Sequence, residues 1–421
     1  MKIFIKKMGC KVNEYEASSL MTSLKLCGHI EVLSPENADI AIVVTCAVTN
    51  EAEAKSRQMV GSITKKNPNI KIIICGCSAQ NNPKQYQSRD NVLAIFGMNK
   101  LDIINFIQNI QTECQYKPNC YISEKYDNYL YPQMDKTRHF VKIQDGCDNF
   151  CSYCLIPYLR GRSRSRSLSD ILIEIKQAQK ESKEVVLTGI NVSDYHTDSG
   201  ETFVDLIKAL QDIDIRLRIS SIECNIITRE LLVELQKCKN FCPHFHLPLQ
   251  SGANQTLKDM NRHYNTDQFL EKVDLIREYF PNCAITTDVI VGFPTETDAD
   301  FDETIETIRK AQFSDIHAFI YSERSGTSIS KIRKPLCSEI LKARKNKMLS
   351  LKKELHNAFL SSHIGKTASM LTENIKGNNV VGYTKEYIKV LLPKDVVGSS
   401  QIVQVKLLEI SGDAMIGKLI D

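Results

Sequence analysis

The stretch Cys147-Asp148-Asn149-Phe150-Cys151-Ser152-Tyr153-Cys154 places three cysteines within eight residues, in the spacing Cys-x3-Cys-x2-Cys. It follows the apolar run 140–143, so the cysteines are expected in a loop after a strand. Thiolate is a soft ligand that suits zinc, copper(I) and iron–sulfur clusters. A structural zinc site normally has four Cys or His ligands, whereas three local thiolates leave one iron of a four-iron cluster open. The stretch therefore indicates an iron–sulfur centre that can bind a substrate; a structural metal knuckle or a group of reduced thiols is the alternative.

This spacing, with the aromatic Tyr153 directly before the third cysteine, resembles the radical S-adenosylmethionine (SAM) superfamily. The resemblance implies that Cys147, Cys151 and Cys154, called here the loop cysteine set, hold a 4Fe–4S cluster. It also implies that the open iron chelates the methionine part of SAM and that an electron from the cluster cleaves SAM to a 5′-deoxyadenosyl radical. Tyr153 is then expected to pack near the adenine of SAM.

Length and composition are those of a globular protein with two or three domains. The chain has 421 residues, of which 42% are hydrophobic and 25% charged, and it holds no long apolar run that would predict a membrane span. Its first residues do not resemble a signal peptide, so we expect the protein in the cytoplasm. Fifteen cysteines in a reducing compartment favour metal binding over disulfides, and a net charge of +4 excludes a strongly basic nucleic-acid binder.

Residues 1–112 alternate strand-like and helix-like segments, which predicts a doubly wound parallel sheet. The strand signals are rich in Ile and Val and lie at residues 2–6, 40–44, 70–74 and 92–96. Cys10, Cys46 and Cys77, called here the N-terminal cysteine set, follow the first three of these strands. Because ligands bind at the carboxyl edge of open α/β sheets, the three thiols are expected to converge there as a second three-thiolate site. Three separate core cysteines are the alternative.

The segments around these cysteines, 8–13, 44–49 and 75–80, resemble the N-terminal domain of the radical-SAM methylthiotransferases. In that family three such cysteines hold an auxiliary 4Fe–4S cluster. Cys75 competes with Cys77 for the third position, because the two lie two residues apart on one strand. We predict Cys77, which occupies the position that matches the family's Gly-Cys-x-Ala-Gln.

Residues 133–363 predict a partial barrel of six β/α units, fewer than the eight of a closed barrel. The strand candidates lie at 139–144, 184–188, 215–220, 244–249, 284–291 and 315–321, with helical segments between them. This arrangement resembles the partial barrel of radical-SAM enzymes, in which the cluster loop follows the first strand. The chemistry is expected at the carboxyl ends of the strands.

Polar residues follow these strands, where a SAM pocket is expected. A glycine at position 189 lets the backbone approach a ligand closely, and the family holds the amino group of SAM there. Hydroxyl and charged groups after the third strand suit the ribose and the carboxylate. Besides Tyr153, the residues assigned to the pocket are Thr188, Gly189, Asn191, Arg218, Ser220, Glu223, His246 and Gln250. For a histidine such as His246, an ordinary core position is the alternative.

Residues 364–421 show short alternating runs separated by turn residues, which predicts a small all-β barrel. It resembles the RNA-binding TRAM domain that ends methylthiotransferases. Residues 111–137, with few aliphatic side chains, are expected to be a connector.

Four arginines alternate with Gly and Ser directly after the cysteine loop: Arg160, Arg162, Arg164 and Arg166. In an extended segment, side chains spaced by two residues project to one face. The sequence therefore predicts a one-sided basic row that can bind nucleic-acid phosphates. The resemblance to the methylthiotransferases implies that these phosphates belong to a tRNA anticodon stem-loop. The alternative is that these arginines pair with carboxylates of the protein itself.

The three modules together resemble the methylthiotransferase family over essentially the whole chain. Segments 142–147 and 160–166 are most similar to the branch that methylthiolates C2 of N6-threonylcarbamoyladenosine at position 37 of tRNA. This implies two molecules of SAM, a sulfur carried by the auxiliary cluster, a separate sulfur donor and a low-potential flavodoxin- or ferredoxin-type electron donor. An isopentenyladenosine tRNA or a ribosomal-protein aspartate is the alternative substrate. A non-catalytic iron–sulfur RNA-binding or sensor protein is the alternative from another class.

Overall fold

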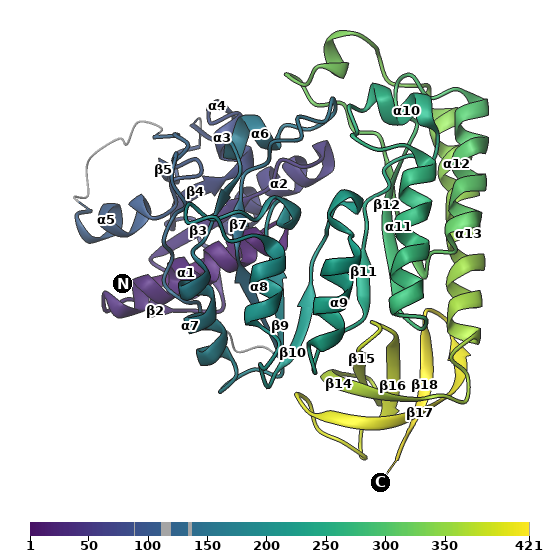
Figure 1. The fold of residues 1–421 in the computed structure, drawn as a ribbon. Helices are drawn as coiled ribbons and strands as arrows, with labels where there is room; N and C mark the ends of the chain where they lie inside the picture. The colour runs from purple at the N-terminus through teal and green to yellow at the C-terminus, as the bar shows by residue number, and fades with distance from the viewer. Residues whose placement is uncertain (88, 111–118, 134–136, 421) are drawn as a thin grey trace. The chain divides into compact units, whose positions relative to one another are not determined.

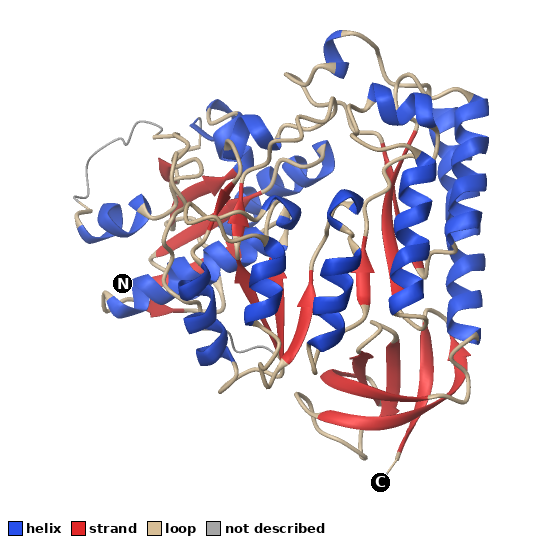
Figure 2. Cartoon of the chain, viewed as in Figure 1, coloured by secondary structure: helices blue, strands red, loops and turns tan. Residues whose placement is uncertain are grey.

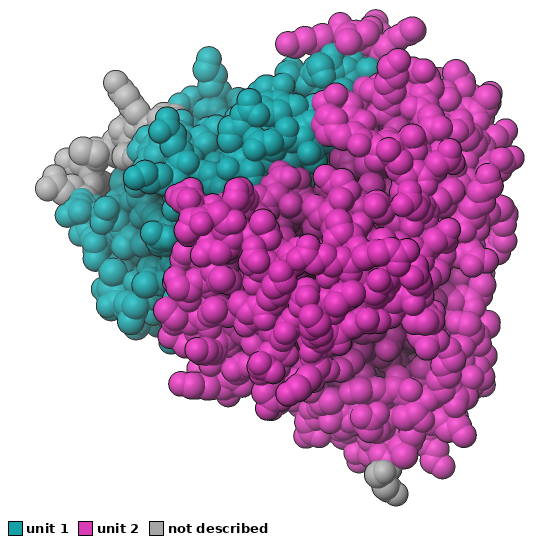
Figure 3. Space-filling model, viewed as in Figure 1, with its two compact units in different colours: residues 1–134, 144–166, 322–330 teal, residues 135–143, 167–321, 331–421 magenta. Residues whose placement is uncertain are grey.

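A computed structural model describes residues 1–87, 89–110, 119–133 and 137–420 (Figures 1 and 2). Two compact units divide the chain, and Figure 3 colours them separately. Unit 1 comprises Met1–Met134, Gln144–Arg166 and Ser322–Ser330, and unit 2 comprises Asp135–Ile143, Ser167–Tyr321 and Lys331–Asp421. The cysteine loop thus belongs to the same unit as the N-terminal sheet. The domain boundaries 1–112, 133–363 and 364–421 remain predictions, and part of the expected connector lies outside the described residues.

The N-terminal sheet of unit 1 is parallel, as predicted, with the strand order β2-β1-β3-β4-β5 (Figure 1). Its strands are β1 (Lys2–Lys7), β2 (Ile30–Glu31), β3 (Ile40–Thr45), β4 (Lys71–Gly76) and β5 (Val92–Ile95). Alternate strand residues point to opposite faces. Ile42 therefore packs with helices α1 (Lys11–Leu26) and α5 (Asp102–Gln108), and Val43 packs on the other face with α2 (Asn50–Lys66). Two apolar clusters, one on each face, make the sheet doubly wound.

Shorter elements of unit 1 surround the carboxyl edge of this sheet. Helices α3 (Cys77–Asn81) and α4 (Lys84–Gln87) follow β4. In the second segment of the unit, β7 (Gln144–Asp145) pairs antiparallel with β8 (Arg164–Ser165). The cysteine loop and the helix α6 (Ile156–Arg160) lie between these two strands in sequence, so the pairing closes the base of the loop.

Unit 2 contains the six parallel strands of the predicted partial barrel, in two three-stranded sheets. The sheets are β10-β9-β6 and β11-β12-β13, with the bounds β6 (Arg138–Lys142), β9 (Glu184–Thr188), β10 (Arg216–Ile219), β11 (His244–His246), β12 (Ala284–Val291) and β13 (Asp315–Ile320). Isolated bridges at Leu217–Phe241 and Ser221–His246 join them. The partial barrel that the sequence predicts is therefore confirmed.

Helices follow the barrel strands as predicted: α7 (Leu168–Ala178), α8 (Phe203–Ala209), α9 (Arg229–Lys237), α11 (Thr266–Tyr279) and α12 (Asp298–Ala311). A short additional helix, α10 (Asn254–Asp259), was not predicted. Three of the helices begin with a capping box, whose first residues are Thr202, Asn265 and Thr297. These side chains satisfy backbone N–H groups that a helix start leaves without partners. The apolar helix faces pack on alternate residues of the strands, such as Ile285 and Val289 of β12.

The C-terminal part of unit 2 is a closed all-β barrel, as the sequence predicts. It follows the long helix α13 (Ser338–Ser361) and consists of β14 (Thr367–Lys376), β15 (Asn379–Thr384), β16 (Lys389–Pro393), β17 (Ile402–Ser411) and β18 (Ala414–Leu419). Its core is formed by side chains such as Met370, Val390 and Leu407. Within the described part of the chain, no helix is both long and apolar enough to cross a membrane.

A buried charged network joins this barrel to the first strands of the partial barrel within unit 2. Glu184 Oε1 accepts hydrogen bonds from Arg138 Nε at 2.7 Å and from Arg218 Nε at 2.8 Å. Arg218 also donates to the Thr384 carbonyl, and its guanidinium lies 4.7 Å from the centre of the Tyr387 ring. Burial alone would raise the pKa of Glu184, but the guanidinium of Arg218, helped by that of Arg138, lowers this pKa from 4.5 to about 2.

We expect Glu184→Gln to destabilise unit 2 by about 3–5 kcal/mol at pH 7, because two buried guanidinium groups lose their charged partner. The folded-state pKa of Glu184 lies below its unfolded value, so its stabilisation is present above pH 4.5 and is lost as the pH falls toward 2. Denaturant titrations of both proteins between pH 7 and pH 2 check this. The difference between them should shrink through this window, and a difference that stays constant would contradict the assignment.

Candidate metal and SAM sites

The N-terminal cysteine set lies at the carboxyl edge of the sheet, after three neighbouring strands of unit 1. Cys10 precedes α1, Cys46 directly follows β3, and Cys77 begins α3 after β4. Strands β1 and β3 are adjacent where the strand order reverses, which is where open α/β sheets bind ligands. Cys10 is exposed, whereas Cys46 and Cys77 are 4% and 3% exposed. The site is therefore open at one thiol and buried at the other two.

Two glycines let the cysteine-bearing loops approach each other. Gly9 has a φ of +96°, and a Cβ atom built on it would lie 2.9 Å from the Sγ atom of Cys46. Gly76 also has a φ of +96°, and its Cβ would lie 2.6 Å from the Thr45 carbonyl oxygen. Only glycine combines a left-handed φ with this closeness. Burial raises the pKa of the Cys46 thiol to about 11, and the thiols of Cys77 and Cys10 act in the same direction.

The structure places Cys75 and Cys77 in different surroundings, although only Gly76, the last residue of β4, separates Cys75 from Cys77, where α3 begins. Cys75 is fully buried in the apolar core beneath α1, and this burial raises its pKa to about 12. Cys77 instead packs beside Ala47, which follows Cys46, and the left-handed Gly76 separates it from the strand. This placement supports the choice of Cys77 over Cys75 as a ligand.

The loop cysteine set lies in a tight turn of unit 1 that backbone hydrogen bonds hold together. Cys147 N donates to the Gly161 carbonyl at 3.2 Å, and Cys154 N donates to the Cys151 carbonyl at 3.0 Å. Gly146, with a φ of +75°, lies so close to residue 161 that a Cβ there would be 2.7 Å from the same carbonyl oxygen. All three cysteines are partly exposed, as is Tyr153 between the last two. The turn thus offers three thiols to a bound group.

Helix α6 connects the loop cysteine set to the N-terminal sheet. Its residue Leu159 and the preceding Leu155 pack against Cys77 and Met98 in one apolar cluster of unit 1. The chemistry of both sets fits iron–sulfur clusters, because each supplies three soft thiolates and the N-terminal set has apolar packing around it. Both three-cysteine sets therefore belong to one compact unit. Helix α6, which follows the loop cysteine set, packs against Cys77 of the N-terminal cysteine set.

A third chain segment completes unit 1. Arg324 of Ser322–Ser330 is buried and donates to Glu53 of α2, with Nη2 and Oε2 2.8 Å apart. The Ile329 amide donates to the carbonyl of Ser152, inside the cysteine loop, at 3.1 Å. The segment Ser322–Ser330 thereby forms hydrogen bonds with both α2 and the cysteine loop.

The prediction of a one-sided arginine row is wrong. Arg160 lies at the end of α6 and is only 1% exposed, and Arg164 and Arg166 are also largely covered. Their guanidinium groups contact Asp145, Glu16 and Tyr15 of the protein itself. The row fails because residue 160 is helical and Gly161 has a φ of +81°, so the extended backbone that the prediction assumed is not continuous.

Arg162 is the exposed member of the four, with a side chain that is 73% accessible. Its Nη1 atom lies 3.2 Å from Asp148 Oδ1, and its guanidinium lies 4.5 Å from the centre of the Phe150 ring. An ion pair this exposed is weak. Arg162 therefore remains available to an anionic partner.

In unit 2, most residues assigned to the SAM pocket lie at the carboxyl ends of barrel strands, as predicted. Thr188 is the last residue of β9, and Gly189 and Asn191 lie in the loop that follows it. Asn191 Oδ1 accepts a hydrogen bond from the Ser193 amide at 3.3 Å. The buried hydroxyl of Ser220 has no hydrogen-bond partner among the described residues, which fits a ligand contact. Gln250 has a φ of +65°, a rare conformation for a residue with a side chain and one often found at functional sites.

Two histidines and a carboxylate gather on the barrel strands of unit 2. The Nε2 atom of His246 lies 3.3 Å from Asp288 Oδ2, and the rings of His246 and His317 have their centres 5.6 Å apart. Glu223, also assigned to the pocket, forms an ion pair with Arg262. His317 and Arg262 were not predicted from the sequence, because each becomes notable only through a partner on another strand or loop.

The assignment of Arg218 to the SAM pocket is wrong. Its guanidinium is buried against Glu184 and donates to the carbonyl groups of Thr384 and Lys385. The residue precedes the end of β10, and its side chain faces the C-terminal barrel. The sequence could not reveal this role, because the partners in the barrel lie 166 and 167 residues away.

Comparison with known proteins covers nearly the whole chain. Residues 141–308 match the radical SAM superfamily, and residues 2–97 match a family described as uncharacterized protein family UPF0004. The chain is 35% identical, over 98% of its length and 97% of the relative's, to "Threonylcarbamoyladenosine tRNA methylthiotransferase MtaB" of Chlamydia pneumoniae. It is 31% identical to "tRNA-2-methylthio-N(6)-dimethylallyladenosine synthase" of Clostridium botulinum, over 99% and 96%.

A solved structure shares the fold at low sequence identity. It is the radical S-adenosylmethionine methyltransferase TsrM of Kitasatospora setae, with cobalamin and a [4Fe-4S] cluster bound. The TM-score is 0.58 and the identity 11%, over 78% of this chain and 73% of that one. The radical-SAM fold, the loop cysteine set and the nearly full-length relatives agree. The chain therefore belongs to the radical-SAM tRNA methylthiotransferases, among their MtaB-type members.

Proposed function

We propose that the protein methylthiolates C2 of N6-threonylcarbamoyladenosine at position 37 of tRNA. The observation that carries the proposal is the presence of two three-cysteine sets in one compact unit, with Leu155 and Leu159 packed against Cys77. Methylthiolation needs a radical to activate the carbon and a sulfur to deliver to it, so two adjacent centres suit it. The substrate branch rests on similarity to relatives that are named for threonylcarbamoyladenosine.

In this proposal the loop cysteine set and the N-terminal cysteine set each hold a 4Fe–4S cluster. When bound, the two clusters supply the electron that cleaves one SAM and the sulfur that a second SAM methylates. The chain's own residues hold these groups and position SAM, for which we retain Tyr153 in the loop and, in the barrel, Thr188, Gly189, Asn191, Ser220, Glu223, His246 and Gln250. A flavodoxin- or ferredoxin-type electron donor and a sulfur donor in the cytoplasm complete the proposal.

The substrate is tested by offering the reconstituted, reduced enzyme three tRNAs that differ only at position 37. They carry threonylcarbamoyladenosine, isopentenyladenosine or plain adenosine, and nucleoside mass spectrometry measures the methylthio product. We expect a methylthio product only from the tRNA that carries threonylcarbamoyladenosine. Product from the isopentenyl tRNA alone would assign the chain to the substrate named for the Clostridium botulinum relative. SAM cleavage without product on any tRNA would redirect the search to a ribosomal protein.

We expect Arg162→Ala to weaken tRNA binding and to reduce its log–log salt slope by about one unit, the value for one lost phosphate contact. Arg162 is the exposed cation of the arginine run, so its loss should leave the fold intact. Arg162→Lys is the matched control and should keep the slope. Arg164→Ala should lower stability without changing the slope, because Arg164 binds Asp145. A wild-type slope in Arg162→Ala would remove Arg162 from the RNA contact.

A further inference from the structure

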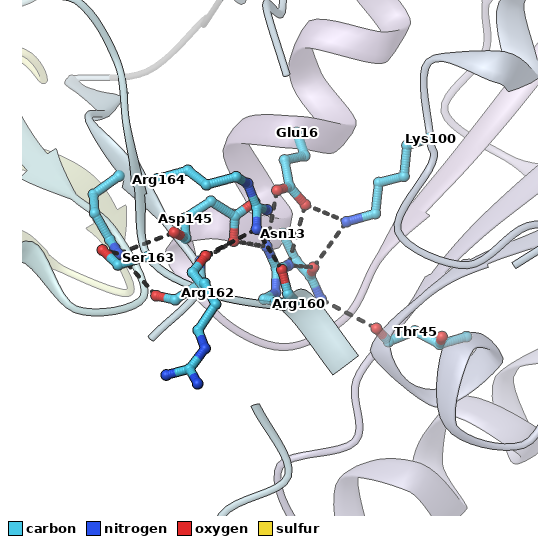
Figure 4. Close-up of polar contacts among 11 residues, drawn as sticks. Asn13, Glu16, Thr45, Lys100, Asp145, Arg160, Arg162, Ser163 and Arg164 are labelled. Carbon is cyan, nitrogen blue, oxygen red and sulfur yellow. Dashed lines mark hydrogen bonds and ion pairs between the residues drawn. The ribbon is translucent and has the colours of Figure 1, made fainter. Parts of the chain in front are cut away.

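Arg160 is the centre of a buried polar network in unit 1 (Figure 4). Its Nη1 atom donates to Glu16 Oε1 at 3.0 Å and to Asp145 Oδ1 at 2.9 Å. Its Nη2 atom donates to Asn13 Oδ1, also at 2.9 Å. The fully buried Lys100 contacts the same Asn13 and Glu16. Two cations from separate parts of the chain therefore converge on one asparagine.

Asn13 links these cations to the N-terminal cysteine set. Its Nδ2 group donates to the Met8 carbonyl at 2.9 Å and to the Thr45 carbonyl at 3.1 Å. Met8 lies two residues before Cys10, and Thr45 directly precedes Cys46. The side chain that accepts from Arg160 and Lys100 thus ties together the two loops that carry two of the three thiols.

The Arg160 guanidinium also acts on the thiols electrostatically. Burial alone would lower the pKa of Arg160, but Asp145, Glu16 and the Cys77 thiol raise it well above its ordinary value, so the group is a permanent cation. This buried cation reaches the loops of Cys10 and Cys46 through Asn13, which accepts from Arg160 and donates to the Met8 and Thr45 carbonyl groups. Charges act strongly on one another in a buried site, because little water screens them.

We propose that Arg160 is a positioning residue of the N-terminal cysteine set, which holds its loops through Asn13 and raises the reduction potential of the cluster bound there. The inference rests on the proposed function, because that function assigns a cluster to this set. A fixed positive charge favours the reduced form of a cluster, which carries one more electron, and net charge and hydrogen bonding set such potentials. Arg160 lies on α6, directly after the loop cysteine set, so one helix serves both sites.

The test uses the full-length protein with Cys147, Cys151 and Cys154 changed to alanine, so that only the N-terminal set can hold a cluster. In this background Arg160→Gln removes the charge but keeps hydrogen-bond donors, and Arg160→Lys keeps the charge. A redox titration followed by electron paramagnetic resonance gives each midpoint potential. We expect Arg160→Gln to lower the reduced-to-oxidised ratio at a fixed potential about tenfold, equivalent to about 59 mV. Arg160→Lys should remain near the parent value.

Lys100→Gln and Arg162→Gln complete the design. Lys100→Gln removes the second cation on Asn13 and should shift the midpoint in the same direction, so the proposal stays testable if Arg160→Gln does not fold. Arg162→Gln removes an exposed cation from the same segment and should leave the midpoint unchanged. A cluster whose midpoint is unshifted in Arg160→Gln and Lys100→Gln overturns this inference alone. A parent protein that is folded but holds no cluster overturns the proposed second cluster and this inference with it.

Discussion

Changing Cys147, Cys151 and Cys154 to alanine is expected to abolish SAM cleavage and to leave a folded protein with about four irons per chain. The three side chains belong to one partly exposed turn that backbone hydrogen bonds close, so their loss should not disturb the N-terminal sheet. Formation of 5′-deoxyadenosine by the reduced protein should fall below detection. Iron analysis and circular dichroism measure the remaining cluster and the fold.

A matched control for this triple variant changes two exposed cysteines outside both sets, Cys27 and Cys337, to alanine. It should keep both the full iron content and SAM cleavage. A folded triple variant without iron would show that the two thiol sets do not bind clusters independently. Persistent SAM cleavage in that variant would remove the loop cysteine set from the reaction.

The second large effect is expected at the N-terminal cysteine set. Cys46→Ala should abolish methylthiolation while SAM cleavage persists, because in the proposed function the radical is made at the loop cysteine set and only sulfur delivery fails. Cys46 is a buried member of the set that lies close to Gly9, and its loss leaves the set with two thiols. Nucleoside mass spectrometry and 5′-deoxyadenosine formation, measured in the same reaction, separate the two steps.

Cys75→Ala is the matched control for the N-terminal set, because Cys75 is an equally buried thiol that faces the core instead of the site. It should cost about 1–2 kcal/mol of stability through lost packing and keep methylthiolation. Cys77→Ala should behave like Cys46→Ala. If Cys75→Ala were inactive and Cys77→Ala normal, the third ligand would have to be reassigned.

Local patterns were sufficient to predict most of the fold. Apolar strands such as 40–44 and 284–291 alternate with amphipathic helices, and both signals come from residues that are neighbours in sequence. The carboxyl-edge position of Cys10 and Cys46 follows from the same pattern, because parallel strands bring their ends together. Spacing alone could not separate Cys75 from Cys77, since the left-handed turn at Gly76 redirects the chain between them.

The arginine run and Arg218 could not be predicted for a different reason. Side chains two residues apart share a face only where the backbone is extended. Arg160 instead ends a helix, and the next residue, Gly161, has a positive φ. The buried partners are also distant, with Glu16 lying 144 residues from Arg160 and Thr384 lying 166 residues from Arg218. Whether an arginine faces solvent or a carboxylate depends on such long-range pairs, and a single sequence does not reveal them.

The three-segment composition of unit 1 has a consequence for how the protein matures on the ribosome. The sheet and its cysteine loops are synthesised early, but Arg324, which binds Glu53 on α2, emerges only after the barrel strands have been translated. At 5–20 residues per second, the interval between residue 134 and residue 322 lasts roughly 10–40 s. During that time the cysteine loop lacks the hydrogen bond that the Ile329 amide later donates to the Ser152 carbonyl. Iron can therefore be delivered to the cysteine loop before Ser322–Ser330 completes unit 1.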